Sequence, residues 1–343
     1  MDPRSEVILR QLDFFKGSVL LAGLPADQLI HALKPQISSL CAWSWHFGEY
    51  SALTQLSSDC HFSAEPPEQQ FDQAIIFLPK SKELTNYLLQ RIASRLKPQG
   101  ELFLVGEKRA GIERAAKQLQ PYGKTLKLDS ARHCQLWQCN LSGPVNDKPL
   151  IDWAKTVVLE PFDHLKVVSL PGVFSHGELD HGTALLLQHL DNLPKGDLLD
   201  FGCGAGVIGC FLKKKYPQQT VHFLDVDAFA LAATRLSLAA NQIAEDDGVH
   251  LIAGRGIADA PHNLGAIISN PPFHQGIHTS YQASEDLLTQ AVLHLNPSHY
   301  SGSELRIVAN SFLKYPPLLK THFGHCHVLA QGHGFHVYQA KRS

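Results

Sequence analysis

The sequence predicts an α/β protein with two tandem domains of the doubly wound, Rossmann-like class, related by an internal duplication. Three observations support this prediction. A chain of 343 residues has the length of two domains, each large enough for its own core. Apolar, strand-like runs alternate with helix-like segments, and one run ends in the kind of glycine-rich turn that begins a doubly wound sheet. Finally, segments of the first half recur in the second half.

The repeat pairs four segments of the first half with four of the second. Each pair covers an expected strand or its surroundings, and the order along the chain is the same. The pairs are Lys16–Gly23 with Lys195–Gly202, Asp72–Lys80 with Ala266–Phe273, Leu88–Val105 with Leu287–Val308, and Leu136–Gln138 with Val337–Gln339. A polar, turn-rich stretch, 140–148, separates the halves. We therefore expect one domain over residues 1–139, a linker over 140–165 and a second domain over 166–343.

The composition favours a globular, cytoplasmic protein. Hydrophobic residues make up 44% and charged residues 18% of the chain, and no run approaches the roughly 20 apolar residues that span a bilayer. The first residues show no basic segment followed by an apolar one, which an export signal would have. The seven cysteines have no regular spacing, which favours reduced thiols over a disulfide framework. We expect no membrane contact, and a monomer.

The second half contains a glycine-rich turn between a strand and a helix. An apolar strand that includes Asp200 runs into Gly202, Gly204 and Gly206, and a helix-like segment follows. Glycines permit a tight turn and a close approach of the backbone to a ligand. A second strand ends at Asp225, about 20 residues later, which is the spacing that lets an acid bind ribose hydroxyls. A dehydrogenase is one interpretation, because the turn also satisfies the dinucleotide pattern G-x-G-x-x-G.

The tetrapeptide Asn270-Pro271-Pro272-Phe273 indicates a different chemistry. It follows the apolar run 266–269, which has the composition of a buried parallel strand, and two prolines require a loop at the end of that strand. The rigid loop directs the Asn270 side-chain oxygen and the Pro271 carbonyl to one place, where they can accept hydrogen bonds from a planar NH2 group. Phe273 then supplies a face on which a flat substrate can stack.

Together these motifs resemble the class I S-adenosylmethionine-dependent methyltransferases, in the branch that methylates planar exocyclic or amide nitrogens. Further segments are similar to the bacterial small-subunit rRNA guanine-N2 methyltransferases, and the resemblance covers essentially the whole chain. These segments are Phe174–Thr183, Phe273–Ser280, Leu305–Asn310 and Val328–Ala340. The resemblance implies S-adenosylmethionine as the cofactor and N2-methylation of a guanosine in 16S rRNA, within the assembled 30S subunit, as the activity.

The resemblance also implies roles for individual residues. The three glycines would approach the methionine part of the cofactor, Asp200 would contact its ammonium group and Asp225 its ribose. Asp180 and Thr183 would form a lid against the cofactor, although a helix cap is an equally good interpretation of Thr183. The substrate amine would be held by the loop. The catalytic residues of this loop would be Asn270, Pro271 and Phe273, and Pro272 and His274 would lie beside the substrate nucleobase.

Two positions of the second half carry open questions. His274 could serve as a base, but methyl transfer to nitrogen needs no strong base, so we expect it only to shape the pocket. Family members commonly have Asp or Asn near the end of the third strand to meet the adenine amino group, whereas Arg255 stands at that position here. Backbone groups or Asp259 are the remaining candidates for holding adenine.

The first half lacks the residues of the expected site. It keeps one glycine, Gly23, and has Phe77-Leu78-Pro79-Lys80 where the second half has Asn270–Phe273. Between Lys80 and Arg132 it carries twelve Lys or Arg against five acids, although the net charge of the whole chain is −2. Such a local excess can attract phosphate. We expect a methyltransferase fold without a site, which docks RNA through Lys80, Lys82, Arg91, Arg95, Lys108 and Arg109.

The sequence also offers a candidate metal site and two alternative functions. A group of side chains near the C-terminus could ligate a metal, but its spacing matches no regular zinc pattern, so we expect none. The group comprises His322, His325, Cys326, His327, His333 and His336. A glutamine-N5 protein methyltransferase would use the same amide-holding loop. A non-catalytic rRNA-binding assembly factor would suit the basic first half, but not the intact glycine turn.

Overall fold

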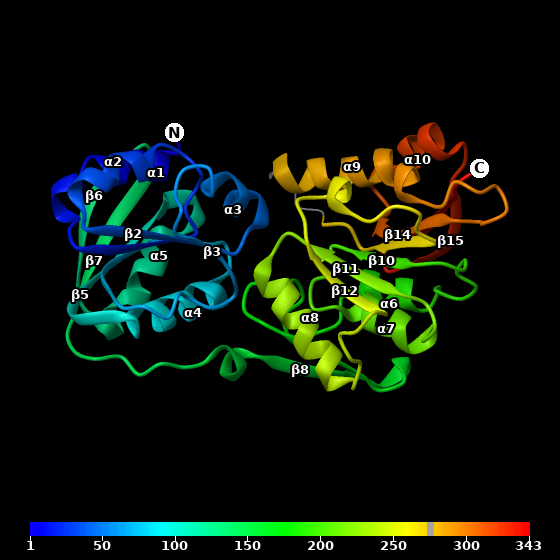
Figure 1. Cartoon of the computed structure of the whole chain (residues 1–343), viewed down its shortest axis with the longest axis horizontal. Coiled ribbons are helices and arrows are strands. Elements are labelled where there is room, and N and C mark those ends of the chain that lie inside the picture. The colour runs from blue at the N-terminus through cyan, green and yellow to red at the C-terminus, as the bar shows by residue number, and fades with distance from the viewer. Residues whose placement is uncertain (273–277) are drawn as a thin grey trace. The chain divides into compact units, whose positions relative to one another are not determined.

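A computed structural model describes residues 1–272 and 278–343, and the chain forms two compact units, Met1–Ala154 (unit 1) and Lys155–Ser343 (unit 2). Each unit contains a seven-stranded sheet with helices on both faces (Figure 1). The division between the units falls inside the stretch 140–165 that the sequence marks as a linker. No helix among the described residues is both long and apolar enough to cross a membrane.

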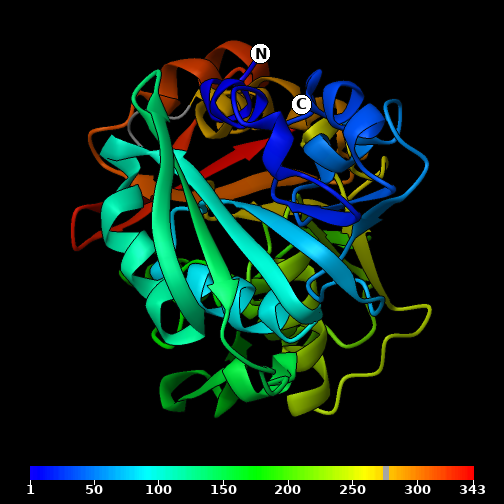
Figure 2. The same ribbon diagram turned by 90° about the vertical axis from the view of Figure 1, so that its left-hand side faces the viewer.

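Unit 1 has the strand order β3-β2-β1-β4-β5-β7-β6, in which β7 runs antiparallel to β5. Figure 2 turns this unit toward the viewer and shows the twist of its long strands between residues 96 and 141, coloured cyan to green. Its elements are α1 (Pro3–Leu9), β1 (Ser18–Ala22), α2 (Leu29–Leu33), β2 (Ser39–Ser44), α3 (Phe47–Leu53), β3 (Cys60–Phe62), β4 (Phe71–Phe77), α4 (Lys82–Ala93), β5 (Leu96–Glu107), α5 (Ile112–Ala116), β6 (Gly123–Ala131) and β7 (Cys134–Leu141).

Unit 2 repeats that topology, with the order β12-β11-β10-β13-β14-β16-β15 and β16 antiparallel to β14. A separate hairpin of β8 and β9 precedes the sheet. The elements are β8 (Lys155–Leu159), β9 (Leu165–Ser169), α6 (His181–Leu187), β10 (Leu198–Phe201), α7 (Val207–Lys215), β11 (Val221–Asp225), α8 (Ala228–Ala240), β12 (Val249–Ala253), β13 (Ala266–Ser269), α9 (His278–His294), β14 (Glu304–Asn310), α10 (Tyr315–Phe323), β15 (His327–Gly332) and β16 (Phe335–Lys341). The prediction of two doubly wound units with one topology is confirmed.

The unit 2 sheet is buried on both faces. Helices α9 and α10 cover one side and α6, α7 and α8 the other (Figure 1). All four residues of β13 are buried, which explains why this strand is a continuous apolar run rather than an alternating one. On the α9 side, Ile267, Leu288 and Leu319 share one apolar cluster and are fully buried. Each such side chain contributes about 1.5–3 kcal/mol to folding.

The parallel register brings the ends of three strands to one edge of the sheet. Leu198 of β10 pairs with Val221 of β11 on one side and with Ala266 of β13 on the other. The strands therefore end together, at Phe201, Asp225 and Ser269. In open α/β sheets, ligands bind in the crevice outside the carboxyl ends of the strands, where the strand order reverses. In unit 2 this reversal lies at β10, between β11 and β13.

The stretch expected to be a linker is structured at both ends. Lys155–Leu159 forms β8, and the hairpin is held on α8 because Val168 N donates to Ser237 Oγ at 2.9 Å. On the unit 1 side, Trp153 packs edge-on against Tyr87 of α4, with ring centroids 5.5 Å apart. The composition of 140–148 indicated turns, but could not show that the flanking residues pack on helices of the two units.

Candidate active site

Three glycines in the left-handed region form the turn between β10 and α7. Their φ angles are +69° at Gly202, +54° at Gly204 and +80° at Gly206, where other residues are strained. A Cβ on Gly204 would meet nothing within 4 Å, so the backbone there faces open space that a ligand can approach. A Cβ on Gly206 would lie 3.0 Å from Thr234, so this glycine also serves packing within the fold.

Asp200 places a carboxylate beneath this turn, inside the protein. The side chain is fully buried, and its Oδ2 accepts a hydrogen bond of 2.8 Å from Gly209 N. Its other oxygen, Oδ1, is buried without a hydrogen-bond partner. Burial raises the pKa of Asp200 to about 7; the Gly209 N–H opposes this shift and the Asp225 charge adds to it. An orphaned buried acceptor beside an open glycine turn fits a ligand that carries a positively charged donor.

Asp225 lies at the end of β11, facing the same turn. Its Oδ2 accepts a hydrogen bond from Gly204 N at 2.9 Å, and its Oδ1 accepts one from Asp227 N at 3.0 Å. Two backbone bonds thus fix the carboxylate while it stays partly exposed. Asp227 caps α8 by accepting from Phe229 N at 2.9 Å, and burial and the Asp225 charge raise its pKa to about 8. Asp227 therefore serves as the N-cap of α8.

The end of the third strand places Arg255 at the surface. Its side chain is 66% exposed, and its backbone N donates to Asp259 Oδ2 at 2.7 Å. The Asp259 carboxylate is thereby turned toward the loop that follows β12. Asp259 and the backbone groups of this loop are the two candidates for holding the adenine.

The Asn-Pro-Pro loop leaves β13 at the same edge. Asn270 is half-buried, Pro271 is buried and Pro272 is exposed. The loop is anchored because Ser284 Oγ of α9 donates to the Pro272 carbonyl at 2.7 Å. A Cβ on Gly202 would lie 3.9 Å from Pro272 Cδ, so the glycine turn and the loop are in direct proximity. Phe273 and His274, for which sequence also predicted roles, lie outside the described residues.

The amide of Asn270 is held by the two residues that the family resemblance assigns to the cofactor. Its Nδ2 donates to Asp180 Oδ2 at 2.9 Å and to Thr183 Oγ1 at 3.0 Å. Asp180 also caps α6 by accepting from Thr183 N at 2.9 Å. Both residues therefore contact the Asn-Pro-Pro loop. No sequence signal indicated these contacts, because they join segments about 90 residues apart in the chain.

Unit 1 fills the corresponding corner with side chains. By the internal repeat, Leu21 stands where unit 2 has Asp200, and it is fully buried. A Cβ on Gly23 would lie 2.6 Å from the indole of Trp45, whereas a Cβ on the corresponding Gly202 would approach only Pro272 Cδ, at 3.9 Å. The expectation that this unit keeps the fold without the site has a physical basis, since an indole packs against the glycine that remains.

One residue expected to contact RNA is buried instead. Arg91 is 3% exposed; its Nε lies 2.8 Å from Asp147 Oδ1, and its Nη1 donates to the Tyr87 hydroxyl at 3.1 Å. It anchors the end of unit 1 to α4, so we correct that assignment. Arg95 pairs with the same Asp147 at 3.4 Å. The other basic residues of the set are exposed. They are Lys80, Lys82, Lys108 and Arg109, the last in an ion pair with Glu107.

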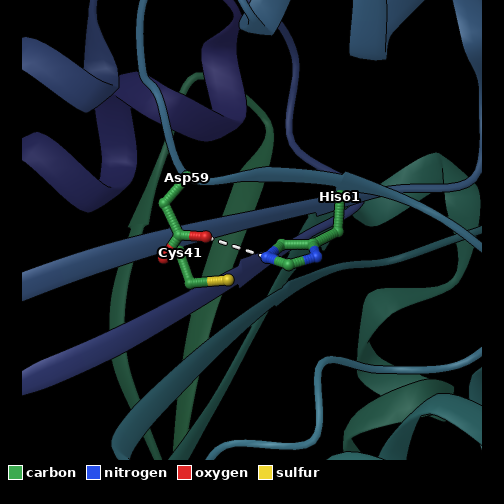
Figure 3. Close-up of side chains that lie close together, drawn as sticks. All are labelled: Cys41, Asp59 and His61. Atoms are coloured by element: carbon green, nitrogen blue, oxygen red, sulfur yellow. Dashed lines mark hydrogen bonds and ion pairs between the residues drawn. The ribbon is translucent and has the colours of Figure 1, made fainter.

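Among the described residues, one group could supply three metal ligands, namely Cys41, Asp59 and His61 of unit 1 (Figure 3). The Asp59 carboxylate lies beside the thiol and 2.8 Å from His61 Nε2. Burial and Asp59 raise the pKa of the Cys41 thiol, which opposes the thiolate that a metal requires. The same strand register in unit 2 holds His222 and His250, whose rings stack at 5.1 Å. We therefore interpret Cys41, Asp59 and His61 as side chains that pack across the paired outer strands β2 and β3, and not as metal ligands.

The histidines near the C-terminus contact their own hairpin and the start of α6. His325 Nε2 accepts from Lys341 N at 3.1 Å, and His336 Nδ1 is hydrogen-bonded to the Tyr338 hydroxyl at 3.0 Å. The His333 ring stacks on that of His181, with centroids 5.1 Å apart. Within the described part of the chain, no set of three candidate metal ligands includes them.

Comparisons with known proteins match both units. The methyltransferase small domain family matches residues 164–339, and its N-terminal counterpart matches residues 5–157. The chain is 57% identical to ribosomal RNA small subunit methyltransferase C of Ectopseudomonas mendocina (strain ymp), over 100% of both chains. It is 54% identical to the protein of that name from Pseudomonas syringae pv. tomato, again over 100% of both.

A solved structure shares the fold of the whole chain. It is the T. thermophilus 16S rRNA N2 G1207 methyltransferase (RsmC), in complex with AdoMet and guanosine, with a TM-score of 0.84. The similarity covers 100% of this chain and 92% of that one, at 21% identity. At this identity the comparison establishes the two-unit architecture alone.

Proposed function

Because the chain belongs to the ribosomal RNA small subunit methyltransferase C family, we propose that it transfers a methyl group from S-adenosylmethionine to the N2 amine of a guanosine in 16S rRNA. The name of the relatives supports a ribosomal RNA substrate, and the T. thermophilus structure was solved with AdoMet and guanosine. Within this chain, one observation carries the proposal. The open glycine turn lies against the Asn-Pro-Pro loop, with the Cβ position of Gly202 at 3.9 Å from Pro272.

The residues around the glycine turn suit this cofactor. S-adenosylmethionine supplies an electrophilic methyl group when bound, and it carries an ammonium group and a ribose. The orphaned Asp200 Oδ1 is the acceptor that an ammonium group would satisfy, directly or through water. The exposed part of the Asp225 carboxylate would accept from the ribose hydroxyls. Gly204 leaves the space for these groups to approach the backbone.

The Asn-Pro-Pro loop would activate the amine. The lone pair of guanine N2 is delocalised into the ring, so the amine is a poor nucleophile. Hydrogen bonds from the NH2 group to Asn270 Oδ1 and the Pro271 carbonyl favour a pyramidal nitrogen with a localised lone pair. Phe273 would stack on the base, which must be unpaired or flipped out to enter. On methylation the nitrogen becomes acidic and releases one proton to water, so His274 is not needed as a base.

Unit 1 would contribute by docking RNA. Its exposed cations are suited to phosphate contacts, whereas Arg91 is not available for them. We further propose that the substrate is the assembled 30S subunit and that the enzyme acts as a monomer in the cytoplasm. Replacing both Lys80 and Lys82 by Ala should weaken rRNA binding and lower the salt slope by about 1–2, as each phosphate contact contributes about one unit.

The test of the activity is a methyl-transfer assay with labelled S-adenosylmethionine. Naked 16S rRNA, 30S particles and a protein extract are offered separately, and the labelled product is identified by nucleoside mass spectrometry. We expect N2-methylguanosine, with more label in 30S particles than in naked rRNA. Asn270→Ala should be nearly inactive, while Asn86→Ala on α4 controls for loss of an amide elsewhere. His274→Ala should keep activity within about tenfold, since removing a true general base typically costs 10²–10⁴-fold.

Two results would overturn the proposal. Label confined to the protein extract would indicate a glutamine-N5 protein methyltransferase. Binding to rRNA without any transfer would indicate an assembly factor.

A further inference from the structure

The Asn270 amide has its direction set by neighbours of known hydrogen-bonding character. An ionised carboxylate can only accept hydrogen bonds, so the atom of Asn270 that faces Asp180 must be the NH2 group and not the oxygen. The amide nitrogen has two protons, and its two partners, Asp180 Oδ2 and Thr183 Oγ1, lie at 2.9 and 3.0 Å. Both donors of the amide are therefore occupied, and its oxygen is left as the acceptor.

The donors and acceptors of this cluster form a consistent cycle. Thr183 Oγ1 lies 3.4 Å from Asp180 Oδ2, to which it donates its hydroxyl proton, and its lone pair accepts from Asn270. The Thr183 backbone N–H also donates to Asp180 Oδ2, at 2.9 Å. Gly182 keeps this arrangement possible, because a Cβ there would lie 3.0 Å from the same Oδ2 and 2.9 Å from the Phe335 ring. Reversing the amide would break two of these bonds at once.

We propose that Asp180 and Thr183 are positioning residues, which lock the Asn270 amide so that its oxygen is presented to the substrate amine. This rests on the proposed function, and it replaces the cofactor contacts that the family resemblance implies for both residues. In this orientation Asn270 can accept a hydrogen bond from a substrate NH2 group but cannot donate one to a substrate carbonyl. The Asp180 charge also polarises the amide, which makes its oxygen a stronger acceptor.

The variant Asp180→Ser separates this role from helix capping. Ser caps helices about as well as Asp, so α6 keeps its cap, but the shorter side chain cannot reach Asn270. We expect kcat to fall at least tenfold, because a net hydrogen bond of about 1.4 kcal/mol corresponds to a factor of ten in rate. The KM for 30S particles and the Kd for S-adenosylmethionine should stay within about threefold of the wild-type values. Asp180→Asn keeps an acceptor oxygen of the right length and should recover part of the loss. Thr183→Val should lose kcat likewise, and Thr183→Ser should recover most of it.

Two measurements report whether these residues act through Asn270. Adding Asp180→Ser to Asn270→Ala should cause no further loss, because the amide it positions is already gone. The side-chain amide resonances of Asn270, in protein labelled with ¹⁵N-asparagine and assigned by their loss in Asn270→Ala, should shift in Asp180→Ser and Thr183→Val. Asp2→Ser, at the N-cap of α1 in unit 1, is the matched capping control and should leave them in place.

The positioning role would be overturned if the losses of kcat multiply in the double variant Asp180→Ser, Asn270→Ala. It would also be overturned if the Asn270 amide resonances do not shift in Asp180→Ser. If the Kd of Asp180→Ser for S-adenosylmethionine rises by as large a factor as kcat falls, Asp180 contacts the cofactor instead. Failure of the wild type to methylate guanosine would instead sink the proposed function. The resonance test needs no substrate, so it still decides the positioning role in that case.

Discussion

The buried Asp200 should make the unliganded protein less stable as the pH rises. Its pKa is raised from 3.8 to about 7 in the folded protein, chiefly by burial. Below the unfolded pKa the carboxyl is neutral in both states and costs nothing. Above it, the unfolded chain releases the proton first, so folding stability falls until the pH passes the folded pKa. Asp200→Asn stays neutral at every pH and should remove the Asp200 contribution, while the contribution of Asp227, whose pKa is also raised, stays in both proteins.

The size of the effect follows from the pKa shift. Each unit of difference corresponds to about 1.4 kcal/mol. The cost of ionising Asp200 grows by about 2.5 kcal/mol between roughly pH 5 and pH 8. The absolute effect of Asp200→Asn also contains the cost of burying an NH2 group, which does not change with pH. We therefore compare the difference between variant and wild type at the two pH values, in which that cost cancels.

The assay must report on unit 2 alone. All four tryptophans, Trp43, Trp45, Trp137 and Trp153, lie in unit 1, so their fluorescence serves as an internal control. Hydrogen exchange of peptides from β10 and β11, followed across a denaturant series, measures the unfolding of unit 2. From about pH 5 to pH 8, the free energy of unfolding of unit 2 in the variant should rise by about 2.5 kcal/mol relative to that of the wild type. Binding of S-adenosylmethionine to the variant should be weaker. Equal pH dependence in the two proteins would refute the reasoning.

Two further predictions concern the turn and the buried arginine. Gly204→Ala should raise the Kd for S-adenosylmethionine at least tenfold by calorimetry, because its methyl group fills open space beside the turn, whereas stability should fall by only about 1 kcal/mol. Gly111→Ala, also left-handed and unobstructed, shares the strain but should leave the Kd unchanged; a lowered affinity there would contradict the prediction. Arg91→Ala should destabilise unit 1 by about 2 kcal/mol in tryptophan-monitored unfolding, because it removes a buried guanidinium that pairs with Asp147 and the Tyr87 hydroxyl, and exposed Arg114→Ala should not. Wild-type stability in Arg91→Ala would contradict the anchoring role of that arginine.

Much of the fold could be predicted because its signals are local. Strands buried on both faces must be apolar along their length, and a tight turn with positive φ angles must be made of glycines. The turn at Gly204 and the loop at Asn270 were therefore identifiable from a few consecutive residues. The repeat then implied the same strand order twice, since equal patterns of elements favour equal topologies. The loss of the site in unit 1 followed from the same local patterns.

What tertiary structure decided are contacts between residues distant in the chain. Arg91 looks like any surface cation in the sequence, and only the return of the chain at Asp147 encloses it. Asp180 meets Asn270 across 90 residues, and Trp45 fills the corner above Gly23. Neighbouring residues determine which backbone shape a segment adopts. The partner of each side chain depends on how the finished elements pack, which no single segment encodes.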